Sequence, residues 1–517
     1  MPAQGGINLA DLPFRAFVAL YLALLALVCA PLLLTPVPPL VDYPNHLARM
    51  YLLANLDHAP VLQQFYQLTW RPVPDLAMDA LVPPLLRIMP LEWAGKLFLV
   101  AIYALLTSGV ALLHRVLFGR WSAWPCLAFL LVYNRLLLWG FVNFLFGLGL
   151  ALCCFAAWLA LRQRGPALRL AIGCVMALAV YFAHLMAFGV YGALILSYEA
   201  SLLVRDKATP RSTLRALLIA GLPMLLPLAM FVTFFLPLNA SIQVMSLSVR
   251  FTRPVRKLDL LFSVFDAYNR PADIVCFAVA VLGIGVAYWR RWIRFAPGIA
   301  AVLTMLTVLY FFMPSGLFSA NGADRRLPLA MALLLIGGST WQAPSRFLRR
   351  VFFGAAGAML ALRLGMVAVS WQASGRVYAE ILSSLDALPA GSCLAVAYLG
   401  EEVHVEATPL LHMPVLAIAR REAFVPSLFT YASQQPVAFT PEYRQLADGL
   451  SADKLWSHFV AGNTTINSAD AAALAQCDYI AFSGRRPFDL AVNAGLEPVF
   501  QSPRFKIYRL IHGAAKP

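Results

Sequence analysis

Charged residues are scarce in this 517-residue chain: only 13% of its residues are charged, whereas 61% are hydrophobic. A soluble protein of this length would cover its surface with far more charge. Apolar runs recur along the first three quarters of the chain, and each is long enough to cross a hydrocarbon core about 30 Å thick. These runs do not alternate as barrel strands do. The sequence therefore predicts membrane-spanning helices, in which the backbone satisfies its own hydrogen bonds.

Other features are also missing from the sequence. The eight cysteines are scattered, without the spacing of a metal site. The C-terminal part has no glycine-rich phosphate loop, and the chain has no convincing internal repeat, which weakens a transporter interpretation. Cys393 and Cys477 would pair only if they lie close together in an oxidising compartment, so their pairing stays open.

The formal net charge is +15, which in a soluble protein would suggest a nucleic-acid partner. Here Lys and Arg lie mostly in short loops between apolar runs, and this pattern sets membrane topology. We therefore expect a lipid bilayer as partner and no nucleic acid.

The apolar runs predict about eleven transmembrane helices. The expected spans are approximately residues 14–36, 93–113, 122–138, 139–161, 170–186, 187–204, 214–237, 272–289, 296–313, 326–341 and 351–372. With a cytoplasmic N-terminus, the inner loops are 114–121, 162–169, 205–213, 290–295 and 342–350, and each is short and basic. This agreement predicts an N-in, C-out protein of the plasma (inner) membrane.

Two regions are expected. Residues 1–372 form a transmembrane module with a long outer loop at 37–92, and residues 373–517 form a soluble extracytoplasmic α/β domain. Short apolar runs in the second region predict buried strands between helical stretches. The expected strands are 393–399, 415–419 and 479–482, the helices are 442–450 and 469–476, and 500–510 is a closing hairpin or edge strand.

The segment Val41-Asp42-Tyr43-Pro44-Asn45-His46-Leu47-Ala48-Arg49 directly follows the first span. Pro44 favours a helix start, so the plainest interpretation makes Asp42 an N-cap, worth about 1 kcal/mol. Asp42 and His46 would also share one helical face. This density of polar groups exceeds what a cap needs, and a carboxylate at the membrane surface suits a general base. We predict catalytic roles for Asp42 and His46, with Asn45 and Arg49 as possible substrate contacts.

These features resemble the GT-C superfamily of membrane glycosyltransferases, which includes protein O-mannosyltransferases and aminoarabinose transferases. The shared features are an Asp just after the first span, a long first outer loop, many further spans and a final soluble domain. The resemblance implies a polyprenyl-phosphate-linked sugar donor and a glycan, lipid or protein acceptor. The Asp-Tyr-Pro-Asn-His sequence is not the paired acid of some members, which leaves the use of Mg²⁺ or Mn²⁺ open.

A departing lipid phosphate needs a cation at the outer membrane surface, and Arg binds phosphate bidentately. Arg325 and Arg326 end an outer loop and precede Leu-Pro, a second similarity to the superfamily; an interfacial anchor is the competing interpretation. Arg135 lies at the outer end of a predicted span. Arg363 falls inside the last span, where a charge normally faces a cavity. We predict phosphate-binding roles for these four arginines.

Other polar residues lie in or beside the predicted spans. Asn143 and His184 are possible substrate contacts, although hydrogen bonding or packing between helices is the favoured interpretation of both residues. Asp75, Asp79 and Glu92 in the first outer loop are weaker candidates, because surface acids are usually solvated.

The resemblance thus implies an inverting glycosyltransferase with Asp42 as base. A transporter or flippase for lipid-linked glycans is one alternative, and repeated halves with broken helices would favour it. A polysaccharide ligase or polymerase is another, distinguished by a base in a late outer loop. A non-catalytic scaffold would have a crowded apolar space above Asp42.

Overall fold

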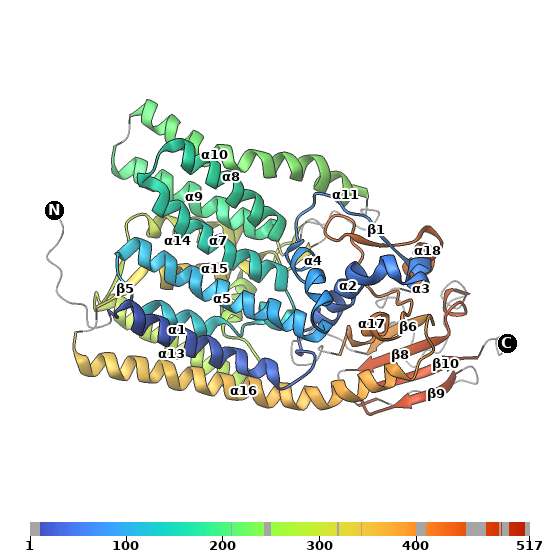
Figure 1. Ribbon diagram of the computed structural model, residues 1–517. Helices are drawn as coiled ribbons and strands as arrows, with labels where there is room; N and C mark the ends of the chain where they lie inside the picture. The colour runs from blue at the N-terminus through green and yellow to red at the C-terminus, as the bar shows by residue number, and fades with distance from the viewer. Residues whose placement is uncertain are drawn as a thin grey trace.

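The computed structural model describes residues 11–207, 209–241, 250–317, 320–342, 344–399, 410–450, 472–484, 487–488 and 496–511. A bundle of apolar helices forms one end of the molecule, and a smaller region with a β-sheet forms the other (Figure 1). The chain is a multi-pass membrane protein, because eight helices within the described ranges are long and apolar enough to span a bilayer. They contain α1 (Phe14–Cys29), α5 (Leu91–Phe118), α7 (Val142–Ala160), α8 (Pro166–Ala183), α9 (Leu185–Arg205), α10 (Pro210–Met230), α13 (Arg270–Trp289) and α16 (Arg346–Asp386). The helical spans that begin with α1, α7 and α10 continue to Leu33, Gln163 and Leu238.

The expected spans 122–138, 296–313 and 326–341 correspond to shorter helices, so the total of about eleven stays a prediction. The first of these runs breaks at Asn134, whose Oδ1 accepts hydrogen bonds from the Leu136 and Leu137 amides at 2.9 and 3.2 Å. This cap ends one helical segment and begins another.

The shorter helices and strands in and around the bundle are η1 (Ala30–Leu33), η4 (Trp124–Leu131), α6 (Arg135–Trp139), η5 (Leu161–Gln163), η6 (Phe231–Phe235), α11 (Leu236–Ser241), α12 (Pro254–Leu261), η7 (Phe262–Val264), β2 (Ile293–Phe295), α14 (Ile299–Phe312), β3 (Gly316–Leu317), β4 (Ala320–Asn321), η8 (Asp324–Arg326), α15 (Leu327–Gly337) and β5 (Ser339–Trp341).

Residues 37–92, the expected first outer loop, fold into short helices at the end of the bundle nearest the β-sheet (Figure 1). Proline is the first or second residue of three of them, as expected for a residue that lacks an amide hydrogen and has a helical φ. Its elements are α2 (Tyr43–Asn55), η2 (Leu56–His58), α3 (Pro60–Phe65), β1 (Tyr66–Leu68), α4 (Ala77–Leu81) and η3 (Pro83–Arg87).

A four-stranded sheet lies in the C-terminal region, with strand order β6-β8-β10-β9. β6 and β8 are parallel, and the other neighbours are antiparallel. Its strands are β6 (Leu394–Leu399), β8 (Tyr479–Gly484), β9 (Leu496–Gln501) and β10 (Phe505–Leu510). The remaining elements of this region are η9 (Met413–Leu416), α17 (Ala417–Arg421), β7 (Val437–Phe439) and α18 (Pro441–Gly449).

One expectation for this region is wrong. Residues 415–419, predicted as a strand, form the end of η9 and most of α17, because Pro414 starts a helical turn. Of the predicted helix 469–476, residues 472–474 are helical and 475–476 form a turn, whereas 469–471 lie outside the described residues. Cys393 and Cys477 form a disulfide that joins the start of β6 to the chain just before β8.

Helix α16 connects the bundle to the sheet without interruption (Figure 1). It has 41 residues, which corresponds to a length of about 60 Å. The predicted domain boundary at 372/373 falls inside this helix, and the division into two domains stays a prediction.

The C-terminal region contacts the first outer loop directly. β1 pairs with β7 in an antiparallel register that places Tyr66 opposite Phe439. The Tyr66 hydroxyl donates to the Ala423 carbonyl at 3.1 Å and accepts from the Val425 amide at 2.8 Å. Segments more than 350 residues apart in the sequence therefore form one surface above the bundle.

A buried cation ties α16 to the helices beside it. Arg363 is 3% exposed, and its Nη1 donates to Asp273 Oδ1 at 2.6 Å and to the Phe265 carbonyl at 2.7 Å. Its Nη2 donates to the Tyr133 carbonyl at 2.6 Å. These contacts neutralise a charge that would otherwise be expensive inside a membrane.

We expect Arg363→Ala to lower the free energy of unfolding by about 3–5 kcal/mol, because the change leaves the Asp273 carboxylate buried without its counter-ion. Arg376, an exposed residue of the same helix, provides the matched control variant Arg376→Ala. Thermal unfolding of the detergent-purified proteins, followed by tryptophan fluorescence, measures the difference. Equal midpoints for the two variants would contradict a stabilising role for Arg363.

Candidate functional site

Asp42 occupies the N-cap position of α2 but does not act as a cap. Its side chain accepts no hydrogen bond from the first turn of the helix. The backbone before α2 is held by α6: the Val41 amide donates to the Leu138 carbonyl at 2.9 Å, and the Asp42 amide donates to the Trp139 carbonyl at 3.1 Å. The carboxylate is 23% exposed, so it is partly open and available for chemistry.

A glycine makes this close approach possible. Gly140 has a φ of +87°, a left-handed conformation that L side chains rarely adopt. A Cβ at this position would lie 2.8 Å from the Asp42 nitrogen. The turn between α6 and α7 therefore packs directly against the backbone of Asp42.

Two imidazoles lie beside Asp42. His412, from the C-terminal region, places Nε2 3.5 Å from Asp42 Oδ1. His46 lies one helical turn after Asp42, and its Nδ1 is 3.1 Å from Arg49 Nη2. Burial and the nearby Arg49 charge hold the pKa of His46 well below its usual value, so its imidazole is neutral at physiological pH.

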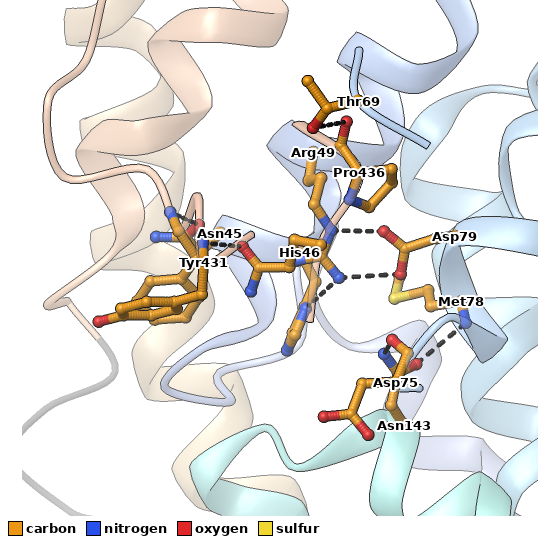
Figure 2. A network of polar contacts seen from close by, with 12 residues as sticks. Asn45, His46, Arg49, Thr69, Asp75, Met78, Asp79, Asn143, Tyr431 and Pro436 are labelled. Atoms are coloured by element: carbon orange, nitrogen blue, oxygen red, sulfur yellow. Dashed lines mark hydrogen bonds and ion pairs between the residues drawn. The ribbon is translucent and has the colours of Figure 1, made fainter. Parts of the chain in front are cut away.

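Arg49 and Asn45 bind other parts of the protein. Figure 2 shows Arg49 between His46 and Asp79, with two bonds to the Asp79 carboxylate at 2.7 and 3.0 Å. Both charged side chains are almost fully buried, and they lock α2 to α4. Asn45 donates to the Ser427 carbonyl at 3.0 Å and accepts from the Phe429 amide at 2.9 Å. These contacts favour positioning roles over the predicted substrate contacts.

Asp75, a weak candidate in the sequence, is held in a strained conformation. Its φ is +72°, and its carbonyl accepts from Asn143 Nδ2 at 2.5 Å. Asn143 Oδ1 also accepts from the Met78 amide at 2.9 Å, so this side chain clamps the loop (Figure 2). Non-glycine residues in this conformation cluster at functional sites.

The Asp75 carboxylate faces the junction of α8 and α9. Oδ1 accepts from the Leu185 amide at 3.0 Å and lies 3.5 Å from His184 Nδ1. His184 Nδ1 also accepts from the Met186 amide at 3.0 Å and so caps α9. Burial raises the pKa of Asp75 to about 6, partly offset by the Leu185 hydrogen bond and by Arg326.

Arg325 and Arg326 have different surroundings. Arg326 is buried, with its guanidinium 4.5 Å from the Phe141 ring, and the carboxylates of Asp75, Asp324 and Asp42 support its charge against burial. Arg325 is only partly buried and lies 4.5 Å above the Trp139 ring. Its Nε has no hydrogen-bond partner among the described residues.

The other two predicted phosphate-binding arginines already have acidic partners. Arg135 forms an ion pair with Asp266. Arg363 uses its donors on Asp273 and two carbonyls, as described above. Occupied donors argue against direct phosphate binding by Arg363, and we do not include it in the site.

Residues 139–141 contact the three candidates that remain, Asp42, Arg325 and Arg326. The Trp139 carbonyl holds the Asp42 amide, and the ring of the same tryptophan lies under Arg325. Phe141, two residues later, lies under Arg326. The start of α2, the turn between α6 and α7, and η8 thus form one polar site above the bundle. His412 was missed because a lone histidine far along the chain carries no motif.

The possible divalent cation requires a donor set. Among the described residues, no group of three or more His, Cys, Asp or Glu side chains could hold a metal ion. The acid and the two imidazoles around Asp42 therefore do not fit a metal centre, and we derive no step through one.

No protein-family model and no curated protein matches this chain. Among solved structures it matches ArnT from Cupriavidus metallidurans bound to undecaprenyl phosphate, with a TM-score of 0.54 and 13% sequence identity. The match covers 98% of this chain and 100% of that chain. The fold is GT-C-like. In this GT-C-like fold, the polar site lies where the first outer loop and the C-terminal region meet above the helix bundle.

We expect Asp75→Asn to change how stability depends on pH. The folded-state pKa of Asp75 is about 6 and its usual value is 3.8, so the folded protein binds this proton more tightly than the unfolded chain. Stability of the natural protein should therefore fall as pH rises from about 4 to 6 and then level off, by roughly 3 kcal/mol. Asn tolerates the positive φ and removes this loss.

Unfolding midpoints of both proteins between pH 4 and pH 8 test this prediction. Asp57→Asn, at an exposed position in the same outer loop, should run parallel to the natural protein. A constant difference between Asp75→Asn and the natural protein across this range would show that Asp75 has an ordinary pKa.

Proposed function

We propose that this protein is a GT-C-type glycosyltransferase that moves a sugar from a polyprenyl-phosphate donor to a glycan, lipid or protein acceptor outside the cytoplasm. The observation that carries the proposal is the arrangement around Trp139. Its carbonyl holds Asp42, whose carboxylate caps no helix, and its ring supports Arg325, whose Nε has no partner among the described residues. The likeness of the fold to ArnT bound to undecaprenyl phosphate supports the donor class.

In this proposal Asp42 acts as the general base. Its carboxylate removes the proton of the acceptor hydroxyl as the acceptor oxygen attacks the anomeric carbon. The bond from that carbon to the phosphate oxygen breaks, polyprenyl phosphate leaves with the bonding electrons, and the anomeric configuration inverts. Asp42 suits this role better than His46, because His46 Nδ1 already accepts from Arg49.

Arg325 is the preferred phosphate ligand. Arg326 is buried among three carboxylates that offset its charge, so a phosphate would have to compete with them. Arg325 is partly exposed, and guanidinium groups bind phosphate through paired hydrogen bonds. Its Nε is buried and has no hydrogen-bond partner among the described residues. Arg326 and the Arg135–Asp266 pair would shape the electrostatic potential around it.

The proposed site lies on the extracytoplasmic side of a plasma (inner) membrane. The basic loops expected on the opposite side of the bundle support this orientation. The Cys393–Cys477 disulfide supports it independently, because such bonds persist in oxidising compartments.

We expect Asp42→Asn to abolish transfer while leaving folding intact. Loss of a general base should lower the rate by about 10²–10⁴-fold. Stability should be unchanged because Asp42 caps no helix. The measurement is transfer of labelled sugar from a polyprenyl-phosphate donor to an acceptor in membranes that contain the purified protein. Asp57→Asn is the matched control, and full activity of Asp42→Asn would remove Asp42 from the mechanism.

Arg325→Gln should weaken donor binding by roughly 10- to 100-fold, because a charge-assisted hydrogen bond contributes about 1.5–3 kcal/mol. Arg325→Lys should recover only part of the affinity, since an ammonium lacks the paired geometry of a guanidinium. Binding of polyprenyl phosphate to the purified protein measures the effect. Arg87→Gln, at an exposed arginine of the first outer loop, is the control, and equal weakening by both Gln variants would indicate only a general charge effect.

A further inference from the structure

His412 stands between two side chains of α2. Its Nε2 lies 3.5 Å from Asp42 Oδ1, and its Nδ1 lies 3.5 Å from Asn45 Nδ2. The residue comes from the C-terminal region, just before η9, and η9 packs on α2. One imidazole thus spans from the proposed base to an amide one helical turn further on.

The orientation of the Asn45 amide is determined by its other contacts. Oδ1 accepts from the Phe429 amide at 2.9 Å, and Nδ2 donates to the Ser427 carbonyl at 3.0 Å. The group that faces His412 Nδ1 is therefore a donor, and Nδ1 must be the acceptor. A neutral imidazole has one donor and one acceptor nitrogen, so His412 carries its proton on Nε2, facing Asp42.

The ring of His412 is confined from one side. The edge of Phe429 contacts it with 4.8 Å between ring centroids, and the same aromatic ring lies 6.4 Å from His46. His412 is only 13% exposed. Among the described residues, His46 on α2 interacts electrostatically with His412, and Arg326 on η8 interacts with Asp42.

Attachment of the C-terminal region does not explain this arrangement. The region is already bound to the first outer loop through Asn45 and through Tyr66 and its strand pairing. What the His412 imidazole adds is a donor aimed at Asp42. The 3.5 Å separation is longer than a closed hydrogen bond, and catalytic hydrogen bonds often tighten only in the reactive complex.

We propose that His412 is a positioning residue of the transfer reaction, which donates from Nε2 to Asp42 and holds that carboxylate toward the acceptor hydroxyl. This inference rests on the proposed function. The C-terminal region then completes a site that the membrane bundle and first outer loop form only in part.

Three variants of the full-length protein test the role. His412→Gln places an amide nitrogen near the position of Nε2, His412→Asn places one near Nδ1, and His412→Phe removes both. We expect Asn and Phe to lower kcat by about tenfold or more, with little change in donor KM. Gln should restore most of kcat, and His58→Asn, at an exposed histidine, is the control.

A second measurement does not depend on activity. In ¹⁵N-histidine-labelled protein, the resonances missing from His412→Gln belong to His412 among the eight histidines. We expect nitrogen shifts of the Nε2–H form and a change in Asp42→Asn protein. An Nδ1–H form, no response to Asp42→Asn, or equal loss of kcat and stability in all three variants would overturn the inference. Nitrogen shifts as expected in a protein that transfers no sugar would instead refute the proposed function alone.

Discussion

Two main-chain hydrogen bonds decide where the first outer loop meets the helix bundle. The amides of Val41 and Asp42 donate to the carbonyls of Leu138 and Trp139, and Gly140 leaves the space for this contact. These bonds fix the start of α2, and the Asp42 side chain makes no capping hydrogen bond. The position of Asp42 is thus set by backbone contacts, whereas Arg325 is placed by the side-chain contact of its guanidinium with the Trp139 ring.

The charged groups are of two kinds: buried ion pairs within the protein, and groups that stay partly exposed. Arg49 with Asp79 and Arg363 with Asp273 are buried pairs whose hydrogen bonds are made within the protein. Such pairs are expensive to break and rigidify the elements that they join. Asp42 is different, because it is partly exposed and its contact to His412 is long. An enzyme needs partly exposed groups to contact a substrate, and buried ion pairs to hold those groups in position.

The sequence predicted the features that depend on local composition. Long apolar runs give spanning helices, and the segment after the first span does contain Asp42. Partners of polar residues were not predictable, because a linear pattern shows which groups occur and not what they meet. Asn45 and Arg49 were therefore assigned to substrate, although Phe429 and Asp79 bind them. Asp75 was discounted as a surface acid, since burial of a loop depends on packing by distant helices. His412 required the docking of the C-terminal region on α2, a tertiary event with no local signal.

The unbroken α16 has a consequence for how this chain can vary in length. A helix turns about 100° per residue, so one residue inserted within it would rotate the whole C-terminal region about the helix axis. That rotation would carry η9 away from α2 and separate β7 from β1. A flexible linker between domains tolerates an insertion, whereas an insertion in this continuous helix rotates everything that follows it. Both the number of residues between Arg363 and the sheet and the rotation that they produce about the helix axis are therefore constrained.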